Sequence, residues 1–124
     1  YKRTPVIRPI APIHQLQKSG VTVAVGGDNV RDVWFPIGNF DPISLMAFSM
    51  PLVQLAPWNR LGLCPFTTAP AELMQMDWDG TIQLGAPANL LLLEASSWSE
   101  ALSSSKFRDI LINGEWLKLK NLPD

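Results

Sequence analysis

The stretch VTVAVGGDN, residues 21–29, decides the fold class that the sequence predicts. Residues 21–25 are β-branched or small and uncharged on both faces, which predicts a short strand buried on both sides, as in a parallel sheet covered by helices. Gly26 and Gly27 end this strand. Asp28 then lies at its carboxyl end, where α/β folds place their chemistry. Position alone leaves a second interpretation open, in which Asp28 caps a turn or the next helix.

An aromatic loop follows the strand. Trp34 and Phe35 stand just before Pro36 and Gly38, so the segment is expected to be irregular. Two interpretations of the aromatic pair stay open: it lines a pocket for a flat ligand, or it is a hydrophobic plug. Arg31 and Asp32 are expected to form a structural pair.

Three helices are predicted around the strand, over residues 12–19, 41–56 and 67–74. Asp41-Pro42 is a helix start, with an N-cap followed by proline in the first turn. Pro51 is expected to kink or restart this helix because it removes a backbone donor. The helix is apolar nearly all round, which predicts burial on several sides and methionines in the core. Thr67 or Thr68 is expected to cap the third helix.

The pattern changes near residue 76. Short strands are predicted over residues 81–84, 90–93, 107–112 and 115–119, with a short helix over 98–105. Asn113-Gly114 lies between two apolar runs, which favours a hairpin with a type I′ turn. We therefore divide the chain into residues 1–76, an α/β segment, and residues 77–124, a β segment.

Composition excludes several classes of function. The chain has 124 residues, a net charge of -1 and 1 cysteine. This charge gives no electrostatic support for nucleic-acid binding, and no apolar run is long enough for a membrane span. We expect a cytoplasmic protein without a disulfide framework. His14 is expected to be a surface imidazole rather than a ligand, and Cys64 a small buried hydrophobe rather than a nucleophile.

Four short motifs in one order carry a resemblance to a known family. They are GDNVRD at 27–32, TTAPA at 67–71, GAPANLLLL at 85–93 and INGEW at 112–116. Over residues 11–117 this series resembles the C-terminal part of the amidohydrolase superfamily, with cytosine deaminase and its relatives as the nearest likeness. The resemblance implies the C-terminal piece of a (β/α)8 barrel, with residues 21–27 as its eighth strand, followed by small β-sandwich strands. The barrel would be incomplete.

The resemblance also implies site residues. Asp28 matches the aspartate that in the family binds the metal, or lies against it, and shuttles a proton from the metal-bound water. Trp34 matches an aromatic position that lines the substrate pocket. Asn29 matches a neighbouring pocket position that is usually acidic in bacterial cytosine deaminases. The implied cofactor is a divalent zinc or iron ion in the full-length enzyme, with none expected on this fragment.

The implied activity is hydrolysis of a carbon–nitrogen bond in a cyclic amidine, with deamination of cytosine or a related N-heterocycle. The family's other metal ligands are histidines or a lysine, and His14 matches none of those positions. We therefore expect a fragment that is inactive alone and that associates with itself or with the missing N-terminal barrel portion. The alternative is a non-catalytic binding or oligomerisation domain derived from such an enzyme.

Overall fold

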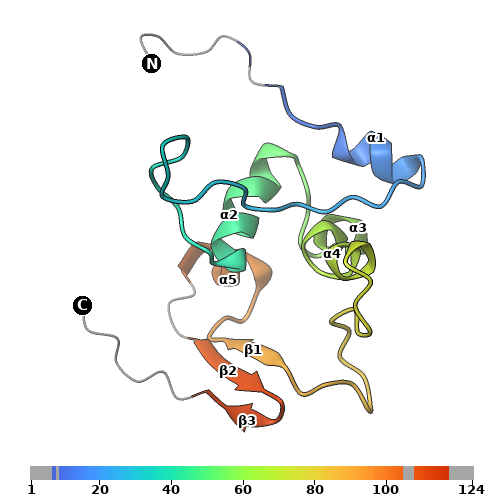
Figure 1. Ribbon diagram of the computed structural model, residues 1–124, viewed down its shortest axis with the longest axis vertical. Helices are drawn as coiled ribbons and strands as arrows, with labels where there is room; N and C mark the ends of the chain where they lie inside the picture. The colour runs from blue at the N-terminus through green and yellow to red at the C-terminus, as the bar shows by residue number, and fades with distance from the viewer. Residues whose placement is uncertain (1–6, 8, 105–107, 118–124) are drawn as a thin grey trace.

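The computed structural model describes residues 7, 9–104 and 108–117. Short helices gather around one central helix, α2, and a small sheet lies at one end of it (Figure 1). In chain order the elements are α1 (Ile13–Lys18), α2 (Pro42–Leu52), α3 (Arg60–Leu63), the 3-10 helix η1 (Cys64–Phe66), α4 (Thr68–Leu73), β1 (Leu90–Leu93), α5 (Trp98–Ser104), β2 (Arg108–Ile112) and β3 (Glu115–Trp116).

Helix α2 begins as predicted but ends earlier. The Asp41 carboxylate accepts a hydrogen bond of 3.1 Å from the backbone N–H of Ile43, and Pro42 occupies the first helical position. Pro51 neither kinks nor restarts the helix, because it lies in the last turn. Gln54 then adopts a φ of 56°, in the left-handed region, and this ends the helix before residue 56.

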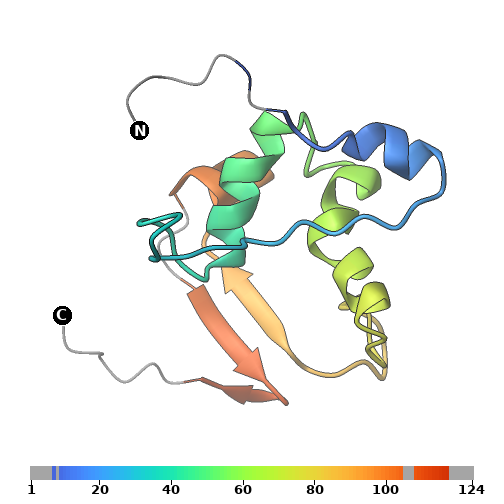
Figure 2. The same ribbon diagram turned by 45° about the horizontal axis from the view of Figure 1, so that its top comes forward.

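The core lies between α1, α2 and the chain that follows α2. Ile13, Met46, Met50 and Leu55 are buried together. Met50 is only 2% exposed, which confirms that the methionines of α2 belong to the core. Helix α5 lies beside α2 in both views (Figures 1 and 2).

Residues 21–25 are extended but form no strand, so the prediction of a strand buried on both sides is wrong for this chain. The N–H of Val25 donates to the carbonyl of Pro65 at 2.9 Å, and that of Val21 to Leu16 at 3.0 Å. Val21 is 47% exposed. A strand needs a neighbouring strand to pair with, and no described residues supply one. The segment instead runs between α2 and the α3–α4 region (Figure 2).

The sheet is antiparallel, in the order β1-β2-β3. Leu90 pairs with Leu111 across β1 and β2, and Ile112 pairs with Glu115 across the hairpin. Asn113 and Gly114 have φ of 51° and 81°, and two positive values in a two-residue loop are those of the predicted type I′ turn.

Other predictions were wrong in detail. Residues 81–84 form no strand. Local hydrogen bonds use two of their backbone carbonyls: the Trp78 indole N–H donates to that of Thr81 at 2.9 Å, and the Ala86 N–H donates to that of Gln83 at 3.1 Å. Thr67 occupies the N-cap position of α4, as predicted, but its side chain makes no capping bond, since its hydroxyl donates to the carbonyl of Leu63. Helix α3, which the Asn59 side chain caps, was not predicted. The predicted strand ends at 107 and 118–119 lie outside the described residues.

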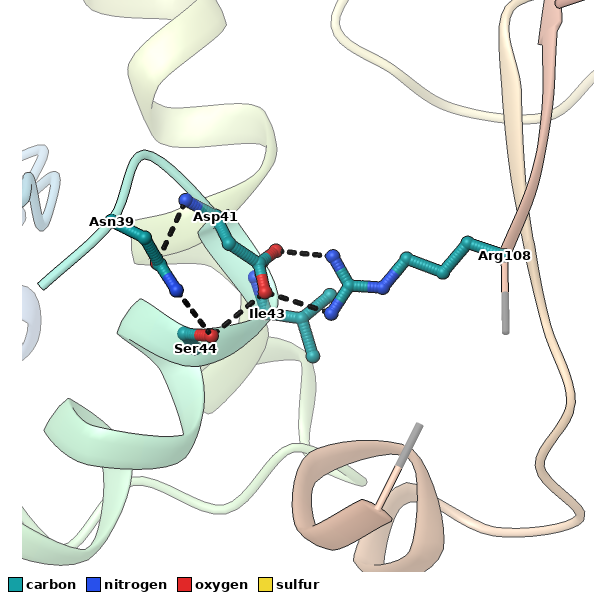
Figure 3. Close-up of polar contacts among 5 residues, drawn as sticks. All are labelled: Asn39, Asp41, Ile43, Ser44 and Arg108. Carbon is teal, nitrogen blue, oxygen red and sulfur yellow. Dashed lines mark hydrogen bonds and ion pairs between the residues drawn. The ribbon is translucent and has the colours of Figure 1, made fainter. Parts of the chain in front are cut away.

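An ion pair attaches the sheet to α2 (Figure 3). The two terminal nitrogens of Arg108, on β2, donate to the two carboxylate oxygens of Asp41 at 2.5 and 2.7 Å. The hydrogen bond from Arg108 is the main cause that lowers the pKa of Asp41 from 3.8 to about 2, against the opposing effect of burial. The helix cap and the sheet contact thus share one carboxylate.

None of the helices in the described ranges has the length and apolar run that crossing a bilayer requires.

Candidate functional site

A cavity of about 520 Å³ lies where the extended segment, the loop after it and the first half of α2 meet. Its walls are mainly apolar, with polar groups contributed by the loop and the helix. The residues that line it are Gly26, Gly27, Asp28, Asn29, Val30, Trp34, Phe35, Ile37, Gly38, Asn39, Ser44, Leu45, Phe48 and Ser49. All three site residues expected from the resemblance therefore lie on one cavity.

Asp28 is one of the residues that line this cavity. The residue is exposed, and its side chain has no hydrogen-bond partner among the described residues. It also lines a smaller adjoining cavity of about 210 Å³. The interpretation of Asp28 as a turn cap is therefore wrong within the described residues, because no backbone N–H donates to its carboxylate.

Asp32, which sequence reasoning took only as a partner for Arg31, organises the loop. One of its carboxylate oxygens accepts from the side-chain amide of Asn29. The other accepts from the backbone N–H groups of Trp34 and Phe35 at 2.9 and 2.8 Å. These hydrogen bonds, the one from Asn29 first, hold the pKa of Asp32 below its usual value. At neutral pH the Asp32 carboxylate is therefore ionised, so it can accept hydrogen bonds but cannot donate them.

Arg31 does not pair with Asp32, which corrects the sequence expectation. The guanidinium Nε of Arg31 donates to the backbone carbonyl of Gly38 at 3.2 Å, and the backbone N–H of Arg31 donates to the backbone carbonyl of Ile37. These bonds close the loop on itself. Gly38 has a φ of 94°, and a Cβ there would lie 3.1 Å from the ring of Phe35. The loop thus has little space for a side chain at residue 38.

The loop leaves Trp34 largely uncovered. Its side chain is 74% exposed, and Phe35 is 40% exposed. The interpretation of this pair as a hydrophobic plug is therefore wrong for Trp34, which lies on the cavity instead of in the core. An exposed indole beside a cavity offers a flat apolar surface to a ring-shaped ligand.

Helix α2 contributes wall residues that sequence reasoning missed. Ser44, Leu45 and Phe48 lie along the side of α2 that borders the cavity. Phe48 is 64% exposed although it belongs to a helix that is apolar nearly all round. That all-round apolar pattern was the available signal: a helix with more apolar surface than its own core uses has a second surface to cover.

Asp28 is the one metal ligand that the resemblance implies, and the described residues form no complete metal site around it. They contain no group of three His, Cys, Asp or Glu side chains arranged to hold an ion. His14 is exposed, and its Nε2 lies 3.1 Å from the carbonyl oxygen of Val53, to which it can donate. Cys64 is half-buried, with its Sγ 3.1 Å from the Thr68 hydroxyl. Neither His14 nor Cys64 lines the cavity that contains Asp28.

The fold matches that of known deaminases. Two crystal structures of 5-methylcytosine deaminase from Klebsiella pneumoniae, one with phosphonocytosine and one with 5-fluorocytosine, each superpose with a TM-score of 0.72. The match covers 93% of this chain and 29% of the solved chain, at 20% sequence identity. At this identity the likeness is one of fold: the chain corresponds to a part of a larger α/β structure.

The sequence itself is related to amidohydrolase-type deaminases. It is 31% identical over 122 residues to pterin deaminase from Rhizobium rhizogenes, a match that covers 98% of this chain and 28% of that protein. It is 28% identical over 91 residues to N-isopropylammelide isopropyl amidohydrolase from Pseudomonas sp., which covers 72% of this chain and 23% of that protein. A scan of protein-family models gave no match. The chain is a homologue of these enzymes and spans about a quarter of their length.

Proposed function

We propose that this chain forms the C-terminal part of a deaminase that hydrolyses an exocyclic carbon–nitrogen bond on a cyclic amidine. The observation that carries the proposal is the cavity on which a free carboxylate, an amide and an exposed indole meet, namely Asp28, Asn29 and Trp34. The substrate class is an amino-substituted N-heterocycle such as pterin or cytosine. Residues 1–76 would be the barrel portion and residues 77–124 the sandwich portion.

Trp34 and Phe48 support the choice of a flat ring as substrate. Both side chains are exposed and both line the cavity, which is of the size that small-molecule sites usually have. Stacking of a heterocycle on an indole contributes about 1–3 kcal/mol by analogy with base stacking. Trp34 is therefore proposed to bind the ring, and Asn29 to contact its polar edge.

The chemistry proposed for Asp28 is proton transfer. Water adds to the ring carbon that bears the amino group, forming a C–O bond. Asp28 accepts a proton from the water and passes it to the amino nitrogen. The exocyclic C–N bond then breaks and the nitrogen leaves as ammonia. The second proton of the water ends on the neighbouring ring nitrogen, whose C=N bond the attack opened, and the ring keeps the oxygen as an oxo group. A carboxylate without other partners among the described residues is suited to this role.

A divalent metal, zinc or iron, is proposed for the full-length protein, and Asp28 would be one of its ligands. Such an ion lowers the pKa of bound water toward about 7 when it is present. The described residues do not complete its coordination, so the remaining ligands would come from other parts of the full-length protein.

The test is ammonia release by the full-length polypeptide that carries this chain, with pterin and cytosine as substrates. We expect D28N to lower kcat by at least about 10²-fold, because general acid–base catalysis contributes about 10²–10⁴-fold. The matched control is D77N, which changes an exposed aspartate that does not line the cavity, and it should keep the wild-type rate. Equal activity of D28N and D77N would contradict the role of Asp28. Absence of ammonia release from any amino-substituted heterocycle by the wild type would contradict the proposed function.

A further inference from the structure

The side-chain amide of Asn29 is held in one orientation by a partner that can only accept. The Asp32 carboxylate is ionised at neutral pH, so the atom of Asn29 that faces it must be the Nδ2 donor. The Oδ1 of Asn29 receives no hydrogen bond from the described residues. Because Asn29 lines the cavity, this Oδ1 is the atom available to accept an N–H from a ligand.

The same carboxylate fixes the backbone that carries the indole. Its Oδ1 accepts from the N–H groups of both Trp34 and Phe35. We propose that Asp32 is a positioning residue that sets the hydrogen-bonding pattern of Asn29 and the place of Trp34 at the candidate site. The proposal rests on the proposed function and deepens it, since it predicts which edge of a heterocycle the site prefers.

The substitution D32N separates the two effects of the carboxylate. The carbonyl oxygen of the new asparagine can still accept from the N–H groups of Trp34 and Phe35, so the loop should keep its shape. The new amide nitrogen, however, replaces the oxygen that faced Asn29, and two donors then face each other. The amide of Asn29 should rotate by half a turn, which exchanges its Oδ1 and Nδ2 and presents a donor where an acceptor stood.

Cytosine and isocytosine are suitable probes, because they have the same shape with the amino and oxo groups exchanged. Pterin carries the isocytosine pattern in its pyrimidine ring. We measure the ratio of the two dissociation constants in the full-length protein. D32N should change this ratio by about tenfold or more, which is the scale of one hydrogen bond of about 1.4 kcal/mol. A merely structural defect would instead weaken both probes by the same factor, and that result would overturn the proposal.

A double-mutant cycle shows whether Asp32 acts through Asn29. With N29A as background, D32N should leave the ratio unchanged, because the rotating amide is absent. A ratio change of the same size in both backgrounds would overturn the proposal.

NMR of the same full-length variants distinguishes failure of this proposal from failure of the proposed function. With uniform ¹⁵N labelling, D32N should shift the Asn29 side-chain amide signals and should move the backbone amide signals of Trp34 and Phe35 much less than D32A does, because D32A removes the acceptor for all three groups. If D32N leaves the Asn29 side-chain signals unmoved, the positioning role is wrong, whatever the enzyme does. If those signals move but neither probe binds the wild type, the proposed function is at fault.

Discussion

Asp41 and Arg108 form an ion pair with two hydrogen bonds, of 2.5 and 2.7 Å, between residues 67 positions apart in the chain. Asp41 caps the start of helix α2, and Arg108 is the first residue of strand β2. Both side chains are mostly covered, with 18% and 26% exposed. The pairing of a planar guanidinium with a carboxylate fixes direction as well as distance, so it sets how the sheet lies against the helix.

This ion pair predicts an acid-dependent component of stability. The pKa of Asp41 is lowered from 3.8 to about 2, so its contribution is complete above about pH 4 and is lost as the pH falls through about 2. R108Q should cost about 1–2 kcal/mol of unfolding free energy at pH 7, after allowance for partial exposure. Urea titrations should show the gap between wild type and R108Q closing between about pH 4 and pH 2. A gap that stays constant with pH would contradict the assignment, and K18Q, on an exposed residue, is the control.

Gly62 predicts a steric requirement in helix α3. It is buried, and a Cβ at this position would lie 2.1 Å from the backbone carbonyl oxygen of Ala56. Because backbone atoms cannot yield as a side chain can, G62A should destabilise the protein by about 1–3 kcal/mol. The control is G26A, where nothing lies within 4 Å of the added carbon. Thermal unfolding that gives both variants the same midpoint would disprove the tight approach.

Met50 predicts the cost of opening the core. Its side chain is 2% exposed and packs with Ile13 and Leu55, whereas Met74 is 65% exposed. M50A should cost about 2–5 kcal/mol, through lost burial and the cavity left behind. M74A should stay within about 0.5 kcal/mol of wild type. Chemical denaturation measures both, and equal losses would show that the core lies elsewhere.

Trp34 predicts a binding role that is separable from stability. W34A should raise KM for pterin or cytosine about tenfold in the full-length protein, since it removes a stacking surface without opening the core. Trp58 is the matched control, because it is similarly exposed, at 78% against 74%, and does not line the cavity. W58A should leave KM and the unfolding midpoint unchanged. If the two variants have the same KM, Trp34 does not contact substrate.

The parts of the fold that were predictable are those determined by local chemistry. Asp41-Pro42 marked the start of α2 because an N-cap and a proline act within one turn. Asn113-Gly114 marked the hairpin because both residues tolerate positive φ. The prediction for residues 21–25 was right that the backbone is extended and wrong that it forms a strand. A strand depends on a neighbouring strand to pair with, which the residues of the segment itself do not encode.

The site was predictable as a position but not as a network. The resemblance brought out Asp28, Asn29 and Trp34, and the structure places all three on one cavity. Their catalytic and binding roles stay predictions. The bonds of Asp32 to Asn29 and to the loop backbone were missed, because a carboxylate next to an arginine in sequence suggests an ion pair. Only the folded loop shows that both carboxylate oxygens of Asp32 accept hydrogen bonds from nearby residues of the same loop.

Asp28 has a φ of 53°, which lies in the left-handed region of backbone conformation. Residues other than glycine adopt this conformation at a cost in free energy. Glycine would relieve that cost, but it would also remove the carboxylate that we propose to act on the ligand. Selection for stability and selection for chemistry therefore pull in opposite directions at this one residue. A directed-evolution experiment that rewarded thermal tolerance alone should accumulate glycine at position 28, and would lose the proposed activity as it did so.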